Sequence, residues 1–375
     1  MKIGIHSEQF DGRGTGKVPY DYGVSLQEIY GYEPIFITSK HPPNEGLKKI
    51  NAKFKSILYN STDSNSIKEE LSQIVDKEKL DFLYMVKSGK NDYKTPSNCK
   101  TGIHCVFLMD EPHGNVYAGV SEFIAKRFGK KEYVPHIIKN YTPTENLRKK
   151  LNIPEDALII GRCGGLETFN VEFAKNAVKT ILDHRKDLYF LFQSTNPFYE
   201  HERVIYLPWV ETEQEKFNFI HTCDAMIHAR HGGESFGLTI GEFSIANKPV
   251  ITWSGVGDHE IHDKNHIDVL DDKAIIYNDQ QELVDILYSI DKQFISSHNW
   301  DKYSEKFFSS SFSSDFSDSD FSFSQSISCE KTIESSHRWR QSLIALQLDA
   351  NITKSKRLYV IIFFKTAILL FCKHT

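Results

Sequence analysis

The chain has 375 residues, a length that suits two α/β domains of ordinary size with a cleft between them. Hydrophobic residues make up 40 % of it and charged residues 25 %, a globular composition that excludes wholesale disorder. The formal net charge of -5 excludes a strongly basic surface, so nucleic acid is not an expected partner.

The N-terminal segment begins directly as a strand over residues 2–7 and lacks the long apolar core of a signal peptide, so export is not expected. The six cysteines are widely spaced without a CxxC pair, which indicates reduced thiols and a cytoplasmic protein. Residues 10–23 carry four glycines and are expected to form a flexible loop before or around a first helix. They are no P-loop, because Val18 follows Lys17 and no hydroxyl is available for magnesium.

Strands and helices then alternate through the first half. Strands are expected over 34–38 and 82–86, with a charged helix over 66–78 between them, and this order favours a parallel sheet. An apolar run over 102–109 ends at the polar cluster 110–114, the place where open α/β sheets bind ligands.

A helix is expected from that cluster to about residue 128, and a last strand of the first half over 133–138, running into a linker over 140–154. The second half repeats the order of the first, with a strand over 157–160, a glycine loop over 161–165 and a helix over 171–184. Further strands are expected over 188–193, 204–207, 225–229 and 249–253, and further helices over 213–223 and 238–246.

The chain is therefore expected to form two doubly wound, Rossmann-like α/β domains, over 1–137 and 138–307. Residues 308–375 are expected to be a disordered tail, because more than half of residues 308–328 are serine. The apolar run 358–372 is too short for a membrane span and carries Lys365, so a buried or aggregation-prone segment is preferred over a membrane anchor.

The residues that carry chemistry are concentrated over 223–252. Glu234 and Glu242 flank seven residues, Phe236-Gly237-Leu238 forms a turn that opens a helix, and Asn247-Lys248-Pro249-Val250 enters the next strand. This pattern resembles the donor-binding signature of retaining glycosyltransferase family 4. The resemblance covers residues 130–290 well and includes Val134-Pro135 and Gly161-Arg162, but it is weak in the first half and absent from the tail.

The resemblance implies the GT-B fold, in which two Rossmann-like domains face a cleft, and a nucleoside diphosphate sugar as donor. It implies that Glu234 contacts the donor sugar and that Glu242 holds the ribose hydroxyls. The residue types fit a diphosphate, since the turn from Ser235 through Phe236 and Gly237 to Leu238 would aim backbone N–H groups at phosphate from a helix N-terminus. Arg162, at a strand end, would grip the diphosphate and stabilise the leaving group.

This chain departs from the family pattern at the loop after Arg162. The usual lysine is absent, and Glu167-Thr168 takes its approximate place. The backbone of Gly164 and Gly165 would partly replace this lysine as an anion nest.

The family also often supplies a histidine from the N-terminal domain near the donor sugar. His113 is preferred for this role over His104, which lies in the middle of a strand. No metal or cofactor is expected besides the nucleotide sugar. His228 and His231 are not spaced as an HExxH helix, and there is no clear DxD carboxylate pair.

Three functions fit these observations. The first is transfer of a hexose from the donor to a hydroxyl of a glycan, protein or lipid acceptor, with retention of configuration. The second is a catalytically weak sugar-nucleotide-binding or scaffolding protein, and the third a sugar-nucleotide epimerase on the same fold. At the residue level, Thr239 to Glu242 also fits a capping box in which Glu242 merely closes a helix N-terminus.

Overall fold

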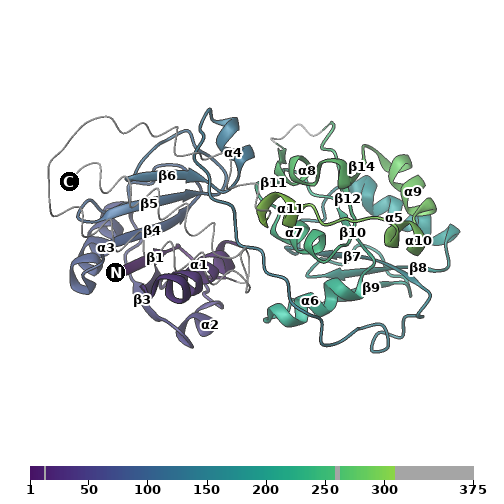
Figure 1. The fold of residues 1–375 in the computed structure, drawn as a ribbon, viewed down its shortest axis with the longest axis horizontal. Coiled ribbons are helices and arrows are strands. Elements are labelled where there is room, and N and C mark those ends of the chain that lie inside the picture. Colours follow the sequence, from purple (N-terminus) through teal and green to yellow (C-terminus); the bar gives the residue numbers. More distant parts are fainter. Residues whose placement is uncertain (12–13, 258–261, 309–375) are drawn as a thin grey trace, which may run out of the picture.

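The computed structural model describes residues 1–11, 14–257 and 262–308, which form two α/β halves side by side (Figure 1). Residues 309–375 lie outside the described residues. The expectations for the tail, including those for the apolar run 358–372, fall in this part of the chain. Each half is built around a parallel sheet of six strands. The expectation of a two-domain α/β protein is confirmed.

The first sheet has the strand order β3-β2-β1-β4-β5-β6. Its strands are β1 (Lys2–His6), β2 (Glu33–Ser39), β3 (Lys55–Tyr59), β4 (Phe82–Lys87), β5 (Lys100–Cys105) and β6 (Val116–Gly119). Along β2, Phe36 packs into one apolar cluster while Ile35 and Ile37 pack into another, because successive side chains of a strand point to opposite faces. One face is covered by α1 (Gly14–Tyr30) and α2 (Leu47–Asn51), the other by α3 (Ser64–Glu78) and α4 (Glu122–Arg127).

The second sheet has the strand order β14-β12-β10-β7-β8-β9. Its strands are β7 (Leu158–Cys163), β8 (Leu188–Gln193), β9 (Val204–Leu207), β10 (Ala225–His228), β12 (Val250–Trp253) and β14 (Ala274–Tyr277). One face is covered by α5 (Glu172–His184) and α9 (Gln280–Ser289), the other by α6 (Glu213–Thr222) and α7 (Leu238–Ile245). Shorter elements complete this half: β11 (Gly233–Glu234), β13 (Asp263–Lys264), α8 (Asn265–Leu270), a 3-10 helix (Asp271–Lys273), α10 (Lys292–Ser296) and α11 (Tyr303–Phe308).

Both sheets have the same topology when their strands are numbered along the chain within each half, namely 3-2-1-4-5-6. In this arrangement the chain leaves the two central strands toward opposite edges, and ligands bind at the carboxyl ends of these strands. The switch point lies between β1 and β4 in the first half and between β7 and β10 in the second. The dense sequence region around Glu234 follows β10 directly.

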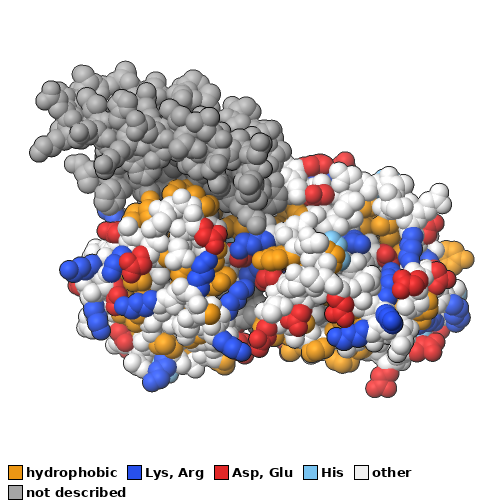
Figure 2. All heavy atoms as spheres, turned by 60° about the horizontal axis from the view of Figure 1, so that its bottom comes forward, with side chains coloured by type: hydrophobic (Ala, Val, Ile, Leu, Met, Phe, Trp, Pro, Cys, Tyr) orange, Lys and Arg blue, Asp and Glu red, His pale blue; other side chains and the backbone are white. Residues whose placement is uncertain are grey.

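Charged side chains gather along the seam between the halves on the face shown in Figure 2. Lys17 of α1 reaches Glu242 of α7 at 2.7 Å, and Arg127 of α4 reaches Asp263 of β13 at 2.6 Å. Apolar contact adds to these ion pairs, since Leu238 packs against a cluster of the first half. The two halves are thus joined by specific contacts as well as by the connecting chain.

The structure corrects three expectations about elements. Residues 14–23 are not a flexible loop but the first turns of α1, because Val18, Tyr22 and Leu26 recur at helical spacing and are buried. Residues 133–138 form no strand apart from a single bridge at Tyr133, since Pro135 cannot donate to a ladder. Residues 116–119 form β6 rather than the start of a helix, and the sequence analysis missed β3 and β14 altogether.

The last described helix, α11, stays with the second half and packs on α7 and α8. Tyr303 is fully buried there, and its hydroxyl donates a hydrogen bond to the carbonyl oxygen of Phe236 at 3.1 Å. Among the described residues, none of the helices is long and apolar enough to cross a membrane.

Candidate functional site

The site is built at the carboxyl ends of β7 and β10, the switch point of the second sheet. Arg162 and Cys163 end β7, and His228 ends β10. After β10 the chain forms the two-residue strand β11, which pairs in parallel with β13. Gly233 has a φ of 63°, and a Cβ there would lie 2.2 Å from the carbonyl oxygen of Asp263, so only glycine allows β11 this close to β13.

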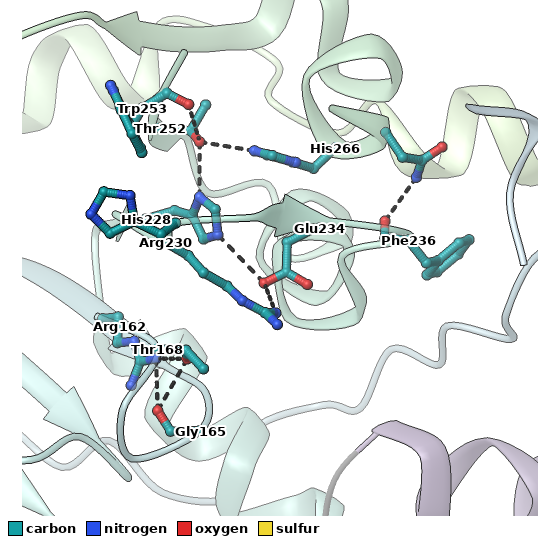
Figure 3. A network of polar contacts seen from close by, with 12 residues as sticks. Arg162, Gly165, Thr168, His228, Arg230, Glu234, Phe236, Thr252, Trp253 and His266 are labelled. Atoms are coloured by element: carbon teal, nitrogen blue, oxygen red, sulfur yellow. Dashed lines mark hydrogen bonds and ion pairs between the residues drawn. The ribbon is translucent and has the colours of Figure 1, made fainter. Parts of the chain in front are cut away.

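Glu234 ends β11, and its carboxylate lies between two cationic or polar partners (Figure 3). Arg230 donates from Nη1 to Oε1 at 2.9 Å, and Nε2 of His228 lies 3.5 Å from the same oxygen. Burial raises the pKa of Glu234, but contact with His228 and Arg230 outweighs it and lowers the pKa to about 2. The carboxylate is therefore ionised at neutral pH, and the relative exposure of the side chain is 24 %.

A buried hydrogen-bond network orients His228 from behind. Its Nδ1 lies 3.0 Å from the hydroxyl of Thr252, which also lies 3.1 Å from Nε2 of His266 (Figure 3). The hydroxyl of Tyr277 donates to the carbonyl oxygen of His228 at 2.8 Å. The sequence excludes His228 and His231 from an HExxH metal site but does not predict the contact of His228 with Glu234. Its position at the end of a buried strand was the available signal.

The turn Ser235 to Leu238 leads into α7, as predicted from the sequence. Gly237 has a φ of 82°, the left-handed conformation that favours glycine, and helix α7 begins at Leu238. The carbonyl oxygen of Phe236 accepts hydrogen bonds from Asn265 and from Tyr303. No side chain among the described residues caps α7, so its first N–H groups point out of the helix without a side-chain acceptor.

Glu242 lies in the middle of α7 and is completely buried. Its carboxylate contacts Lys17 at 2.7 Å and also Lys216 of α6. Burial raises the pKa of Glu242, but the two ammonium groups outweigh it, and the net shift is downward. The capping-box alternative is wrong, because the helix begins at Leu238 and the Glu242 side chain is engaged by lysines instead of by the helix N-terminus.

Arg162 is almost completely buried, and its guanidinium group shapes the loop that follows β7. It donates to the carbonyl oxygens of Ser194 at 3.1 Å and Gly165 at 3.0 Å, and to the hydroxyls of Thr195 and Thr168. These four acceptors use the donors of both terminal nitrogens. The guanidinium thus holds the 163–168 loop, including Gly164, under the site (Figure 3).

The structure does not bring His113 together with Glu234. Its Nδ1 lies 2.8 Å from the carbonyl oxygen of Glu111, and its ring packs near Tyr117. His113 lines a cavity of about 510 Å³ in the first half, and no described residue of the second half lines this cavity.

His104 is fully buried in β5, which agrees with its interpretation as a core residue. Its ring centroid lies 5.4 Å from that of His136, which in turn lies 4.8 Å from that of Phe236. His136 is therefore the histidine of the connector that reaches the turn, and the sequence analysis did not single it out. Its place directly after Val134-Pro135, the expected domain junction, was the available signal.

Among the described residues, no group of three or more His, Cys, Asp or Glu side chains is arranged to hold a metal ion.

Comparison with known proteins establishes the fold. Neither a protein-family model nor a curated protein matches this chain. Among solved structures, a glycosyltransferase from Rickettsia africae ESF-5 superposes with a TM-score of 0.65 at 14 % identity, covering 100 % of this chain and 99 % of that one. HepE from Anabaena, in complex with UDP-glucose, superposes with a TM-score of 0.63 at 11 % identity, covering 82 % and 94 %.

A protein described as a UDP-N-acetylglucosamine 2-epimerase, from Listeria monocytogenes, superposes with a TM-score of 0.52 at 11 % identity, covering 81 % of this chain and 94 % of that one. Similarity at such low identity shows the fold and not the reaction. The chain has the GT-B fold, with two doubly wound domains.

Proposed function

We propose that this protein is a glycosyltransferase that moves a hexose from a nucleoside diphosphate sugar to an acceptor hydroxyl, with retention of configuration. The observation that carries the proposal is the placement of Glu234, the Gly237 turn and Glu242 together at the switch point of the second sheet. The fold is shared with a protein described as a glycosyltransferase and with HepE, whose structure was solved in complex with UDP-glucose.

In this proposal the donor lies along the start of α7. The N–H groups of the Gly237–Leu238 turn, which the N-cap residue does not cap with a side chain, and the positive end of the helix dipole attract the diphosphate. Gly164 and Gly165, on the loop held by Arg162, offer further backbone donors. Glu242 accepts the ribose hydroxyls, and its two lysines move aside to admit them.

Glu234 contacts the donor sugar in this proposal. Its ionised carboxylate stabilises the positive charge that develops on the ring as the bond to the diphosphate breaks. The Arg230 and His228 contacts keep the carboxylate in place, so it acts through its field and a hydrogen bond. No side chain is assigned as nucleophile. The acceptor oxygen bonds to the anomeric carbon from the face that the leaving diphosphate vacates, as the bond to the phosphate oxygen breaks, and the hydroxyl proton passes to the departing phosphate.

The test is release of nucleoside diphosphate from UDP-, GDP- and ADP-hexoses by the purified protein, with and without a panel of glycan, peptide and lipid acceptors. Glu234→Gln is expected to lower turnover about 100-fold or more, since it removes a charge aimed at the transition state. Glu202→Gln, which changes an 86 % exposed glutamate, is the matched control and is expected to be neutral. A Glu234→Gln variant as active as the wild type would contradict the proposal. The anomeric coupling of the product, measured by NMR, tests retention.

A catalytically weak sugar-nucleotide-binding protein is the second candidate. It is favoured by the full engagement of Arg162 and by the two lysines on Glu242, which leave few free groups at the site. Calorimetric binding of a nucleoside diphosphate without turnover of any tested sugar nucleotide would support it. An epimerase, the third candidate, would form an altered sugar nucleotide with no acceptor present.

A further inference from the structure

A diphosphate bound in the proposed donor site needs more positive charge than Arg162, Arg230 and the helix N-termini supply. A diphosphate carries two or more negative charges, and helix N-termini alone offset only about half a charge each. Arg162 donates to four protein acceptors, and the loop after it, residues 163–168, contains the acidic Glu167 and neither lysine nor arginine. Arg230 is paired with Glu234. Another source of positive charge is therefore required.

Two lysines from other elements lie at this place. Lys17 extends from the first half and contacts both Glu242 and Glu213 at 2.7 Å. Lys216 extends from α6 and contacts the other oxygen of Glu242. Both side chains are mostly buried, with a relative exposure of 12 % for Lys17 and 18 % for Lys216.

The lysines adjoin the elements that would hold the phosphates. Burial raises the pKa of the Cys163 thiol at the end of β7, and Lys216 is near enough to lower it in part. A Cβ on Gly14, the first residue of α1, would lie 2.8 Å from Cδ1 of Leu238, the first residue of α7. The N-termini of these two helices thus meet, and Lys17 stands one turn into the first of them.

The proposed function requires the carboxylate of Glu242 to exchange its lysine partners for the hydroxyls of the ribose. Its two oxygens, which are paired with two cations, can also accept hydrogen bonds from the two hydroxyls of a ribose. When the hydroxyls occupy it, both ammonium groups lose their main partner inside the protein. Lys17 then keeps Glu213 as a carboxylate partner at 2.7 Å, and a diphosphate on the same nucleotide offers both lysines further negative charge.

We infer that Lys17 and Lys216 bind the donor diphosphate and supply the positive charge that Arg162, fully engaged by protein acceptors, does not supply. The inference rests on the proposed function, because it presupposes a nucleoside diphosphate in this site. It also makes the first half part of the donor site, since Lys17 belongs to α1. Glu213 then acts against binding, because it competes with phosphate for Lys17.

Isothermal titration of the full-length protein with a nucleoside, its monophosphate and its diphosphate tests this inference. The base used is whichever of UDP, GDP and ADP binds the wild type most tightly. Lys17→Met and Lys216→Met are each expected to weaken diphosphate binding at least 10-fold while changing nucleoside binding less than about 3-fold. Lys17→Arg is expected to restore most of the affinity, and Glu213→Gln to increase it. Lys175→Met, which removes a lysine paired with Glu172 of its own helix, is the neutral control.

Each outcome decides the matter. Loss of diphosphate but not nucleoside affinity in both methionine variants supports the inference, provided that their thermal midpoints show a folded protein. Unchanged or higher diphosphate affinity in both variants overturns it and leaves the proposed function standing. Wild-type protein that binds none of the three diphosphates contradicts the proposed function itself and the inference with it.

Discussion

The two glutamates of the donor motif differ sharply in their surroundings. Glu234 is partly exposed and contacts Arg230 and His228, whereas Glu242 is completely buried between Lys17 and Lys216. A partly exposed carboxylate can contact a sugar without any rearrangement. A buried one must exchange partners before it can bind a ribose. The two glutamates, one on β11 and the other in α7, thus have different electrostatic surroundings.

The ionisation of Glu234 makes a stability prediction. The pKa of this group is about 2 in the folded protein and near 4.5 in the unfolded chain, so its contribution is present above pH 4.5 and is lost as the pH falls toward 2. The stability advantage of wild type over Glu234→Gln is expected to shrink by about 2 kcal/mol between pH 7 and pH 3. Urea unfolding at both pH values measures it. An advantage independent of pH would show that the carboxylate is not held ionised, and Glu202→Gln provides the baseline.

The hydroxyl of Thr252 makes a second residue-scale prediction. It is buried and joins His228 to His266, so Thr252→Val removes the partner of two imidazoles while keeping the side-chain shape. The free energy of unfolding is expected to fall by about 1–3 kcal/mol, the usual effect of leaving buried polar groups without a partner. Chemical denaturation measures the change. Thr180→Val on α5, whose hydroxyl bonds only within its helix in the described structure, should change stability by less than 1 kcal/mol.

At the scale of elements, packing decided what local propensity left open. Helix α1 contains three glycines and Pro19, which are all poor helix formers, yet it runs for 17 residues. It is stabilised because Val18, Tyr22 and Leu26 bury one stripe of the helix against the first sheet. Helix α7 differs from α1, because it is buried on nearly all sides and needs a small residue where it packs closely against its neighbours.

Gly241 is that residue, and it makes an element-scale prediction. A Cβ there would lie 2.3 Å from Cδ1 of Ile138 and 2.7 Å from Cδ1 of Tyr303, so Gly241→Ala forces the connector and α11 away from α7. Unfolding free energy is expected to fall by about 1–3 kcal/mol, the range for overpacked cores. Gly165→Ala, where the nearest atom of Thr168 lies at 3.3 Å, is the control. Equal stabilities of the two variants, measured by urea titration, would refute close packing at α7.

At the scale of the whole molecule, the candidate site lies where ion pairs join the two halves. Arg127 of α4 binds Asp263 of β13, and β13 pairs with β11, the strand that carries Glu234. Lys17 makes a second link, to α7. Both glutamates of the motif are thus linked to the first half, Glu242 directly and Glu234 through the pairing of β11 with β13.

The Arg127–Asp263 pair makes a prediction at this scale. A double-mutant cycle with Arg127→Ala and Asp263→Asn is expected to give a coupling free energy of about 1 kcal/mol, because both side chains are mostly buried. The same cycle on Lys126 and Glu122, an exposed pair within α4, should give less than about 0.5 kcal/mol. Thermal denaturation measures both. Equal coupling in the two cycles would mean that the halves gain nothing from this ion pair.

The sequence by itself determined the alternation of strands and helices, the repeat of one α/β plan in two halves, and the glycine turn before α7. These features follow from local causes, namely hydrophobic periodicity and the left-handed conformation that Gly237 supplies. Errors arose where local signals conflict with burial, as at the glycine-rich start of α1. They also arose where strands are short and half-exposed, as in β3 and β14.

Only the tertiary structure decided which charges meet. Lys17 and Glu242 are separated by 225 positions, yet their ion pair defines the buried end of the site. Likewise, Arg162 donates hydrogen bonds to Ser194 and Thr195. His136, rather than His113, contacts the turn through Phe236. No local pattern encodes such contacts, because they depend on how two sheets and a connector pack together. The motif therefore indicates a donor site, and the packing of the halves decides which side chains complete it.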